Sequence, residues 1–180
     1  VAVGTVMTLV VQSSSATIAV LQNFASQPGP DGVTSILGLA GAIPILLGDN
    51  IGTTITALLA SIGQSKDAKR TAVAHCIFNI SGCVLFIWFV KPFAALIQNI
   101  SPKGPEIEVI SRQIANAHTV FNITMTLIWV CLIKLMVKIV MTLIPDGKKG
   151  VEDPGSPIYL DENIISQPAA ALQLVARSEE

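Results

Sequence analysis

Four long apolar stretches occupy most of the chain, and polar residues interrupt two of them. The first stretch covers about residues 1–24 and contains QSSS near its centre, and the second covers about 33–62 and contains GDNIGTT. The third and fourth stretches cover about 71–97 and 114–144 without such an interruption. Because a helix needs about 20 apolar residues to cross a bilayer, these last two predict full spans. The pieces beside each interruption are too short to cross, so we predict two broken or re-entrant helices.

Charge is sparse within these stretches. Only 13% of the residues are charged, whereas about a quarter are charged in a typical soluble domain. Up to residue 64 the charged residues are Asp31 and Asp49, and residues 113–133 contain none. The pattern predicts an all-α integral membrane protein embedded in lipid. A net charge of −1 gives no reason to expect a nucleic-acid partner, and the three cysteines lack the spacing of a metal site or a disulfide framework.

Polar segments mark the expected boundaries. We predict a membrane domain over residues 1–144, a linker over 145–157 and the start of a helical domain over 158–180. The loop with KDAKR (residues 66–70) is basic, as is the group Lys134, Lys138, Lys148 and Lys149, and basic loops favour the cytoplasmic side. We therefore expect that loop and the C-terminal tail to be cytoplasmic. The chain opens within an apolar stretch, and we expect it to be a fragment of a longer protein.

The QSSS interruption is a candidate binding site. Irregular backbone at membrane depth is tolerated only where protein covers it or where it lines a water-filled cavity. Serines are good N-caps, and the free N–H groups and dipole of a helix that begins here would attract an anion. The hydroxyls add donors for phosphate-like oxygens and acceptors for a hard cation such as Na+. The candidate ligands are Gln12, Ser13, Ser14 and Ser15. The alternative is a continuous helix whose hydroxyls bond to the preceding turn.

The GDNIGTT interruption is a second candidate. Its glycines permit unusual backbone angles and close approach of another segment. Asn50, Thr53 and Thr54 supply oxygens, and Asp49 is a carboxylate at apparent membrane depth, where an ionisable residue suggests a site. No lysine follows the second glycine, so the motif is not a phosphate-binding P-loop. An aqueous loop between two short helices is the alternative. Two broken helices together predict the midplane site of a secondary transporter.

A short repeat opens the third and fourth stretches. Both carry the pattern A-x-A-H-x-x-F-N-I, which contains His75 and Asn79 in one copy and His118 and Asn122 in the other. A spacing of four places each histidine and asparagine on one helix face. Our preferred interpretation is that they form hydrogen bonds between two related spans. The alternative is a relay for protons or cations, or contact with a substrate.

These motifs resemble those of the sodium–phosphate cotransporter family, the type II class and its bacterial members. The resemblance rests on QSSSAT from Gln12, GDNIGTT from Gly48 and A-H-x-x-F-N at His75 and His118, and it covers roughly residues 4–144. It implies an inverted-repeat transporter with two QSSS-bearing halves whose QSSS stretches contribute to Na+ and phosphate sites. This chain resembles the second half, so the N-terminal repeat would lie upstream. The family pattern more often has alanine where Asp49 stands.

The resemblance implies Na+-coupled phosphate symport across the plasma membrane, with Na+ as coupling ion and no organic cofactor. The tail from Pro157 to Glu179 is similar to the junction that leads, in bacterial members, into a domain resembling the PhoU phosphate regulator. Three other functions remain open. They are symport of another oxyanion, phosphate sensing without transport, and an intramembrane hydrolase, for which no spacing of serine and histidine gives support.

Overall fold

Helices make up the part of the chain that the computed structural model describes, residues 1–146. The helices are α1 (Ala2–Val11), α2 (Ser14–Ala25), α3 (Gly38–Ala60), α4 (Lys66–Ile87), α5 (Val90–Ile100), α6 (Glu106–Cys131) and α7 (Ile133–Leu143). An isolated β-bridge between Pro28 and Ser35 closes the loop between α2 and α3. Apart from its first two residues, the predicted linker lies outside the described residues, as does the predicted helical domain (158–180).

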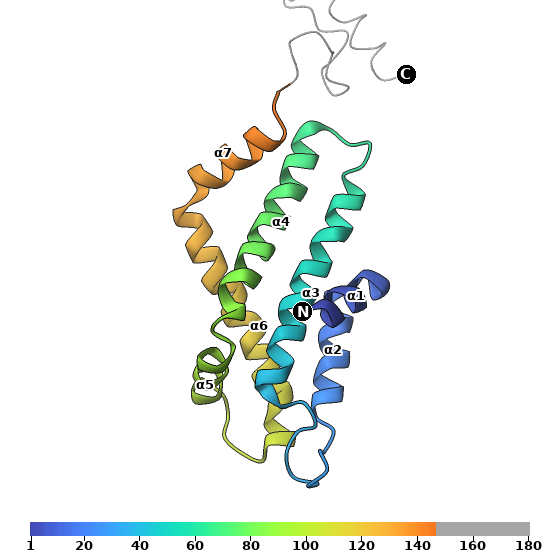
Figure 1. Cartoon of the computed structure of the whole chain (residues 1–180), viewed down its shortest axis with the longest axis vertical. Helices are drawn as coiled ribbons and strands as arrows, with labels where there is room; N and C mark the ends of the chain where they lie inside the picture. The colour runs from blue at the N-terminus through green and yellow to red at the C-terminus, as the bar shows by residue number, and fades with distance from the viewer. Residues whose placement is uncertain (147–180) are drawn as a thin grey trace, which may run out of the picture. The chain divides into compact units, whose positions relative to one another are not determined.

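Three of these helices, α3, α4 and α6, are long and apolar enough to cross a membrane. They run side by side over much of their length and contact one another (Figure 1). Phe121 of α6 is fully buried among them. The ring of Phe86 packs edge-on against Phe121 and against Phe93 of α5, with centroids 5.0 and 4.9 Å apart. The prediction of an all-α membrane protein is therefore confirmed for the described residues.

The third and fourth apolar stretches each divide into two helices, where we predicted one span each. Helix α4 begins at Lys66, earlier than expected, and its 22 residues already extend about 33 Å, enough for the hydrocarbon core. The remaining apolar residues form α5 after a bend at Trp88 and Phe89. In the same way, α6 ends at Cys131 and α7 follows after Leu132. Each stretch was longer than one crossing requires.

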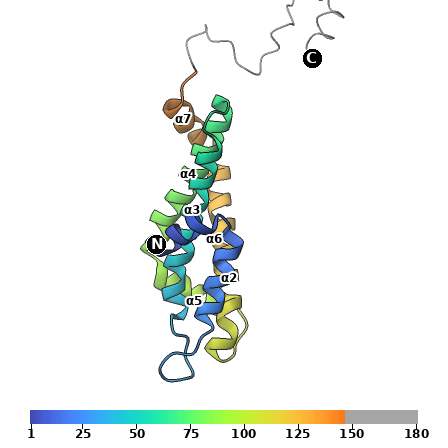
Figure 2. The ribbon, with the colours of Figure 1, turned by 90° about the vertical axis from the view of Figure 1, so that its right-hand side faces the viewer.

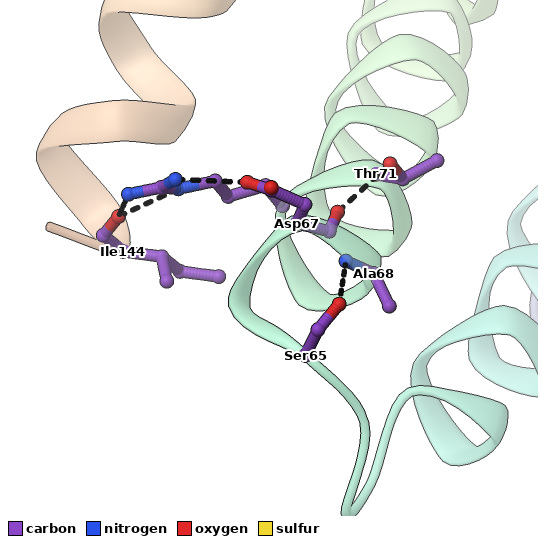
Figure 3. A network of polar contacts seen from close by, with 6 residues as sticks. Ser65, Asp67, Ala68, Thr71 and Ile144 are labelled. Carbon is purple, nitrogen blue, oxygen red and sulfur yellow. Dashed lines mark hydrogen bonds and ion pairs between the residues drawn. The ribbon is translucent and has the colours of Figure 1, made fainter. Parts of the chain in front are cut away.

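The KDAKR segment is the first turn of α4, so our prediction of a loop there was wrong. The Ser65 hydroxyl caps the helix by accepting from the N–H of Ala68 at 3.3 Å, and Asp67 lies in the first turn, where the helix dipole favours a carboxylate. Arg70 donates to Asp67 at 2.9 Å and to the backbone oxygen of Ile144 at 2.9 and 3.0 Å. Figure 3 shows how these contacts join the start of α4 to the end of α7.

The QSSS interruption breaks the helix, as predicted. Helix α1 ends at Val11, Gln12 takes the left-handed conformation with φ 55°, Ser13 is extended, and α2 begins at Ser14. Helix α1 lies across the middle of α3, whereas α2 runs along the lower half of α3 (Figures 1 and 2). The break therefore lies near mid-height of the three long helices.

The GDNIGTT interruption does not break the helix, and this prediction was wrong. Helix α3 runs without interruption from Gly38 to Ala60, with Asp49 as its central residue. Two of its polar side chains bond to their own helix: Asn50 donates to the backbone oxygen of Leu46 at 3.0 Å, and Thr53 donates to that of Asp49 at 3.0 Å. A continuous helix also keeps the backbone N–H and C=O groups hydrogen-bonded, whereas a break in lipid would leave some of them without partners.

Close packing explains why glycines occupy this part of α3. A Cβ atom at Gly48 would overlap the carbonyl oxygen of Val1, and one at Gly52 would lie 2.6 Å from the Cβ of Thr8. Thr5 of α1 also donates to the backbone oxygen of Gly48 at 3.0 Å. The close approach that we expected from the glycines is thus present, and it brings the backbones of α1 and α3 together.

Candidate functional site

A polar cavity of about 230 Å³ lies among α2, α3, α4 and α6. All four helices contribute to its wall. The lining residues are Ser14, Asn50, Thr53, His75, Phe78, Asn79, His118 and Asn122. All but Phe78 are residues that the sequence nominated as ligands or relay groups. The sequence did not nominate Phe78.

The first turn of α2 brings backbone donors to this cavity. Ser14, the first residue of α2, lines the cavity, and Ser13 caps the helix by accepting from the N–H of Ala16 at 3.3 Å. The N–H groups of Ser14 and Ser15 have no carbonyl partner within α2, because the first turn of any helix lacks one. The positive end of the helix dipole therefore lies at the cavity wall, where it favours an anion.

Helix α3 contributes oxygen atoms from its central turns. The hydroxyl proton of Thr53 is donated to the backbone oxygen of Asp49, so the lone pairs of that hydroxyl can accept or coordinate. The amide nitrogen of Asn50 is bound to the backbone oxygen of Leu46, which fixes the side chain and leaves its oxygen for another partner. The wall formed by α3 thus offers acceptors suited to a hard cation.

The repeated histidine and asparagine pairs meet at the same cavity. Asn79 donates to the backbone oxygen of His75 at 3.2 Å, and Asn122 donates to that of His118 at 2.8 Å. Each asparagine is therefore fixed by its own helix, and within residues 1–146 none of the four side chains bonds to another helix. Our preferred interpretation, hydrogen bonds between the two spans, was wrong. The repeat instead places equivalent polar groups of α4 and α6 around one space.

Several nominated residues do not line the cavity. Gln12, Ser13 and Ser15 are exposed at the break between α1 and α2. Thr54 is buried beside α4, where its hydroxyl donates to the backbone oxygen of Ile51 at 2.7 Å. Asp49 is fully buried and lies outside the lining.

Asp49 belongs to a second polar cluster, between α3, α1 and α2. Its Oδ1 accepts from the hydroxyl of Thr8 at 2.6 Å, and that hydroxyl lies 3.4 Å from the hydroxyl of Thr17. Both threonines are buried. Sequence reasoning did not nominate either of them. The signal that could have found Thr8 is a hydroxyl residue in an apolar helix one turn before the QSSS break.

The helical unit contains three helices long and apolar enough to cross a membrane, and a polar cavity lies beside the break between α1 and α2, a combination that is typical of secondary transporters. The family model described as Na+/Pi-cotransporter matches residues 1–102, which is more than half of the chain. The chain belongs to the Na+/Pi-cotransporter family.

Curated relatives agree with this assignment. The chain is 36% identical over 100 residues to the uncharacterized protein YqeW of Bacillus subtilis (strain 168), an alignment that covers 56% of this chain and 30% of that protein. It is 40% identical over 98 residues to the human sodium-dependent phosphate transport protein 2B, covering 52% of this chain and 13% of that protein. The chain thus spans less than a third of either relative. No solved structure matches the chain significantly.

Proposed function

We propose that this chain is part of a sodium-coupled phosphate symporter and that its polar cavity contributes to the phosphate and Na+ site. The observation that carries the proposal is the convergence of seven nominated polar residues from four helices on one cavity. Polar side chains at membrane depth are costly unless they serve a site or have partners, and here they surround a common space. Membership of the Na+/Pi-cotransporter family supports the choice of substrate and coupling ion.

Phosphate binds at the α2 side of the cavity. The N–H groups of the first turn of α2 and the hydroxyl of Ser14 donate to its oxygens, and the α2 dipole stabilises its charge. His75 and His118 line the same cavity and can each donate a ring N–H. Ser13 and Ser15 flank Ser14, and Gln12 lies at the turn before them, where the upstream half of the transporter would complete the site.

Na+ binds at the acceptor-rich wall. The oxygens come from four side chains whose donor groups already bond to backbone: Thr53, Asn50, Asn79 and Asn122. Thr54, which the sequence also nominated, has no place in this cavity. Transport follows from movement of one helical bundle against another around a site near mid-membrane.

The membrane orientation follows from basic residues. Arg70 binds the end of α7, so Lys66 and Lys69 in the first turn of α4 and the α7 lysines Lys134 and Lys138 belong to neighbouring helices. Figure 1 shows the start of α4 and the end of α7 at the same end of the helical unit. We propose that this end is cytoplasmic, since positive charge favours that side.

The test measures radiolabelled phosphate uptake by the intact protein in liposomes, with an inward Na+ gradient or an equal K+ gradient. We expect uptake with Na+ only. Ser14→Ala should lower the apparent phosphate affinity about tenfold, as expected for loss of a hydrogen bond to a charged ligand. Thr119→Ala is the matched control, because Thr119 is an exposed hydroxyl residue of α6 outside the cavity.

The same assay separates the alternatives. Uptake that sulfate or a carboxylate competes away at equal concentration would assign the protein to another oxyanion. Phosphate binding without flux under either gradient would identify a sensor. If Ser14→Ala and Thr119→Ala behaved alike, the cavity would not be the phosphate site.

A further inference from the structure

The carboxylate of Asp49 has a feature that the proposed phosphate site does not explain. The side chain is fully buried, and its Oδ2 atom has no hydrogen-bond partner among the described residues. No lysine, arginine or histidine of residues 1–146 forms an ion pair with it. A buried carboxylate without a counter-charge is strongly unfavourable. A proton would neutralise the charge, but Oδ2 would still lack a partner.

The groups around Asp49 include more hydrogen-bond acceptors than donor protons. The hydroxyl of Thr8 has one proton for three neighbouring acceptors: Asp49 Oδ1 at 2.6 Å, the backbone oxygen of Gly4 at 3.0 Å and the hydroxyl of Thr17 at 3.4 Å. Thr17 donates its own proton to the backbone oxygen of Ser13 at 3.1 Å. Its lone pairs therefore stay available on the side of Thr8, which bonds to Asp49.

Helix geometry favours a positive charge at the same place. Thr8 belongs to the last turn of α1, where the helix dipole is negative and carbonyl oxygens lack helical partners. The titratable group that interacts electrostatically with Asp49 is His118, across the cavity wall on α6. It forms no direct bond with the carboxylate.

We propose that Asp49, Thr8 and Thr17 form a binding site for a small monovalent cation, Na+, separate from the cavity and next to it. Carboxylate and hydroxyl oxygens are the ligands of hard cations, and a bound Na+ would give Oδ2 a partner and neutralise the buried charge. The choice of Na+ rests on the proposed symport function. The site itself rests on the contacts of Asp49.

The test measures Na+ binding without transport. The intact protein in detergent is heated in NaCl or in choline chloride at equal ionic strength, without phosphate, and the midpoint of unfolding is followed against Na+ concentration. An ion that binds only the folded state raises this midpoint. Asp49→Asn keeps the size of the side chain and an acceptor for Thr8, and should raise the Na+ concentration for half-maximal stabilisation at least tenfold. Asp31→Asn, in an exposed loop, should match the wild type.

Thr17→Val removes one oxygen at nearly constant shape. It serves as the test of the Na+ site if Asp49→Asn does not fold. It should also weaken the Na+ dependence. Unchanged Na+ dependence in Asp49→Asn, or in Thr17→Val when it is the deciding variant, would overturn the site. If the Na+ effect depends on Asp49 but liposomes show no Na+-driven phosphate uptake, the cation site stands and only the proposed transport function fails.

Discussion

The two polar interruptions look alike in the sequence and differ in the fold. At Gln12–Ser15 the helix ends, turns through a left-handed residue and starts again. At Gly48–Thr54 the helix continues, and the side chains of Asn50, Thr53 and Thr54 bond to its own backbone. The first interruption supplies a helix N-terminus to the cavity, whereas the second supplies side-chain oxygens and a surface for close packing.

The difference teaches that polar residues alone do not break a membrane helix. Asparagine and threonine can satisfy themselves within a helix by bonding to the preceding turn. At QSSS the serine at the break instead caps the next helix. The glycines of α3 are explained by the backbone of α1, which lies against them. Three predictions test this contrast and a fourth tests the loop between α2 and α3, and they follow from the largest expected effect to the smallest.

Gly48→Ala should be the most damaging change. The added methyl group would overlap the Val1 carbonyl, and α1 would have to move away from α3. We expect a loss of about 3 kcal/mol in the free energy of unfolding, at the upper end of overpacking effects. Thermal or denaturant unfolding in detergent would measure it.

Gly41→Ala is the matched control. It lies in the same helix, but the nearest atoms to its new methyl group belong to the flexible side chain of Leu37, at 3.1 Å. Equal stability of the two variants would mean that close contact between α1 and α3 is not the reason for Gly48.

Thr53→Val and Thr54→Val should separate two neighbouring residues of α3. Thr53 lines the cavity, whereas Thr54 is buried outside it. Thr53→Val should raise the Na+ or phosphate concentration for half-maximal uptake about tenfold, since one polar contact with a charged ligand is lost. Thr54→Val should leave these concentrations within about twofold. A larger effect of Thr54→Val than of Thr53→Val would place the binding site on the other face of α3.

Ser13→Ala should cost about 1 kcal/mol of stability, because it removes the N-cap of α2. Ser15→Ala is the control, since Ser15 is exposed and lies inside the same turn. Unfolding midpoints of the two variants give the comparison. Indistinguishable midpoints would show that the break does not depend on capping by Ser13.

Protonation of the Asp31 carboxylate should have the smallest effect, which is a pH-dependent loss of stability in its loop. The hydroxyl of Thr34 and the N–H groups of Val33 and Thr34 hold the pKa of this exposed carboxyl at about 2, below the ordinary 3.8. A lowered pKa means that the carboxylate stabilises the loop above pH ~4 and that this contribution disappears as the pH falls towards 2. The protection of the Val33 and Thr34 amides against hydrogen exchange, relative to the intrinsic rate at each pH, should therefore fall over that range. Asp31→Asn should abolish this pH dependence of the protection, and equal protection in the wild type and the variant at every pH would refute the assignment.

The sequence was sufficient for the helical membrane class, for the break at QSSS and for seven residues of the cavity wall. These follow from local rules of apolar length, capping and spacing. The segment that lies against the glycines of α3 was not predictable in this way, because the approach of α1 to Gly48 and Gly52 is a tertiary contact. The cluster of Thr8 and Thr17 with Asp49 also needs tertiary contacts, since its members come from three helices.

The contact between α1 and α3 has a mechanical consequence. Backbones that touch at glycines leave little room between the helices, so we expect α1 and α3 to move together. The nearest non-helical residues after α1 are Gln12 and Ser13, and this turn is the joint between α1 and α2. Any rocking of α2 against the long helices would bend the chain at that joint, directly before Ser14, which lines the cavity.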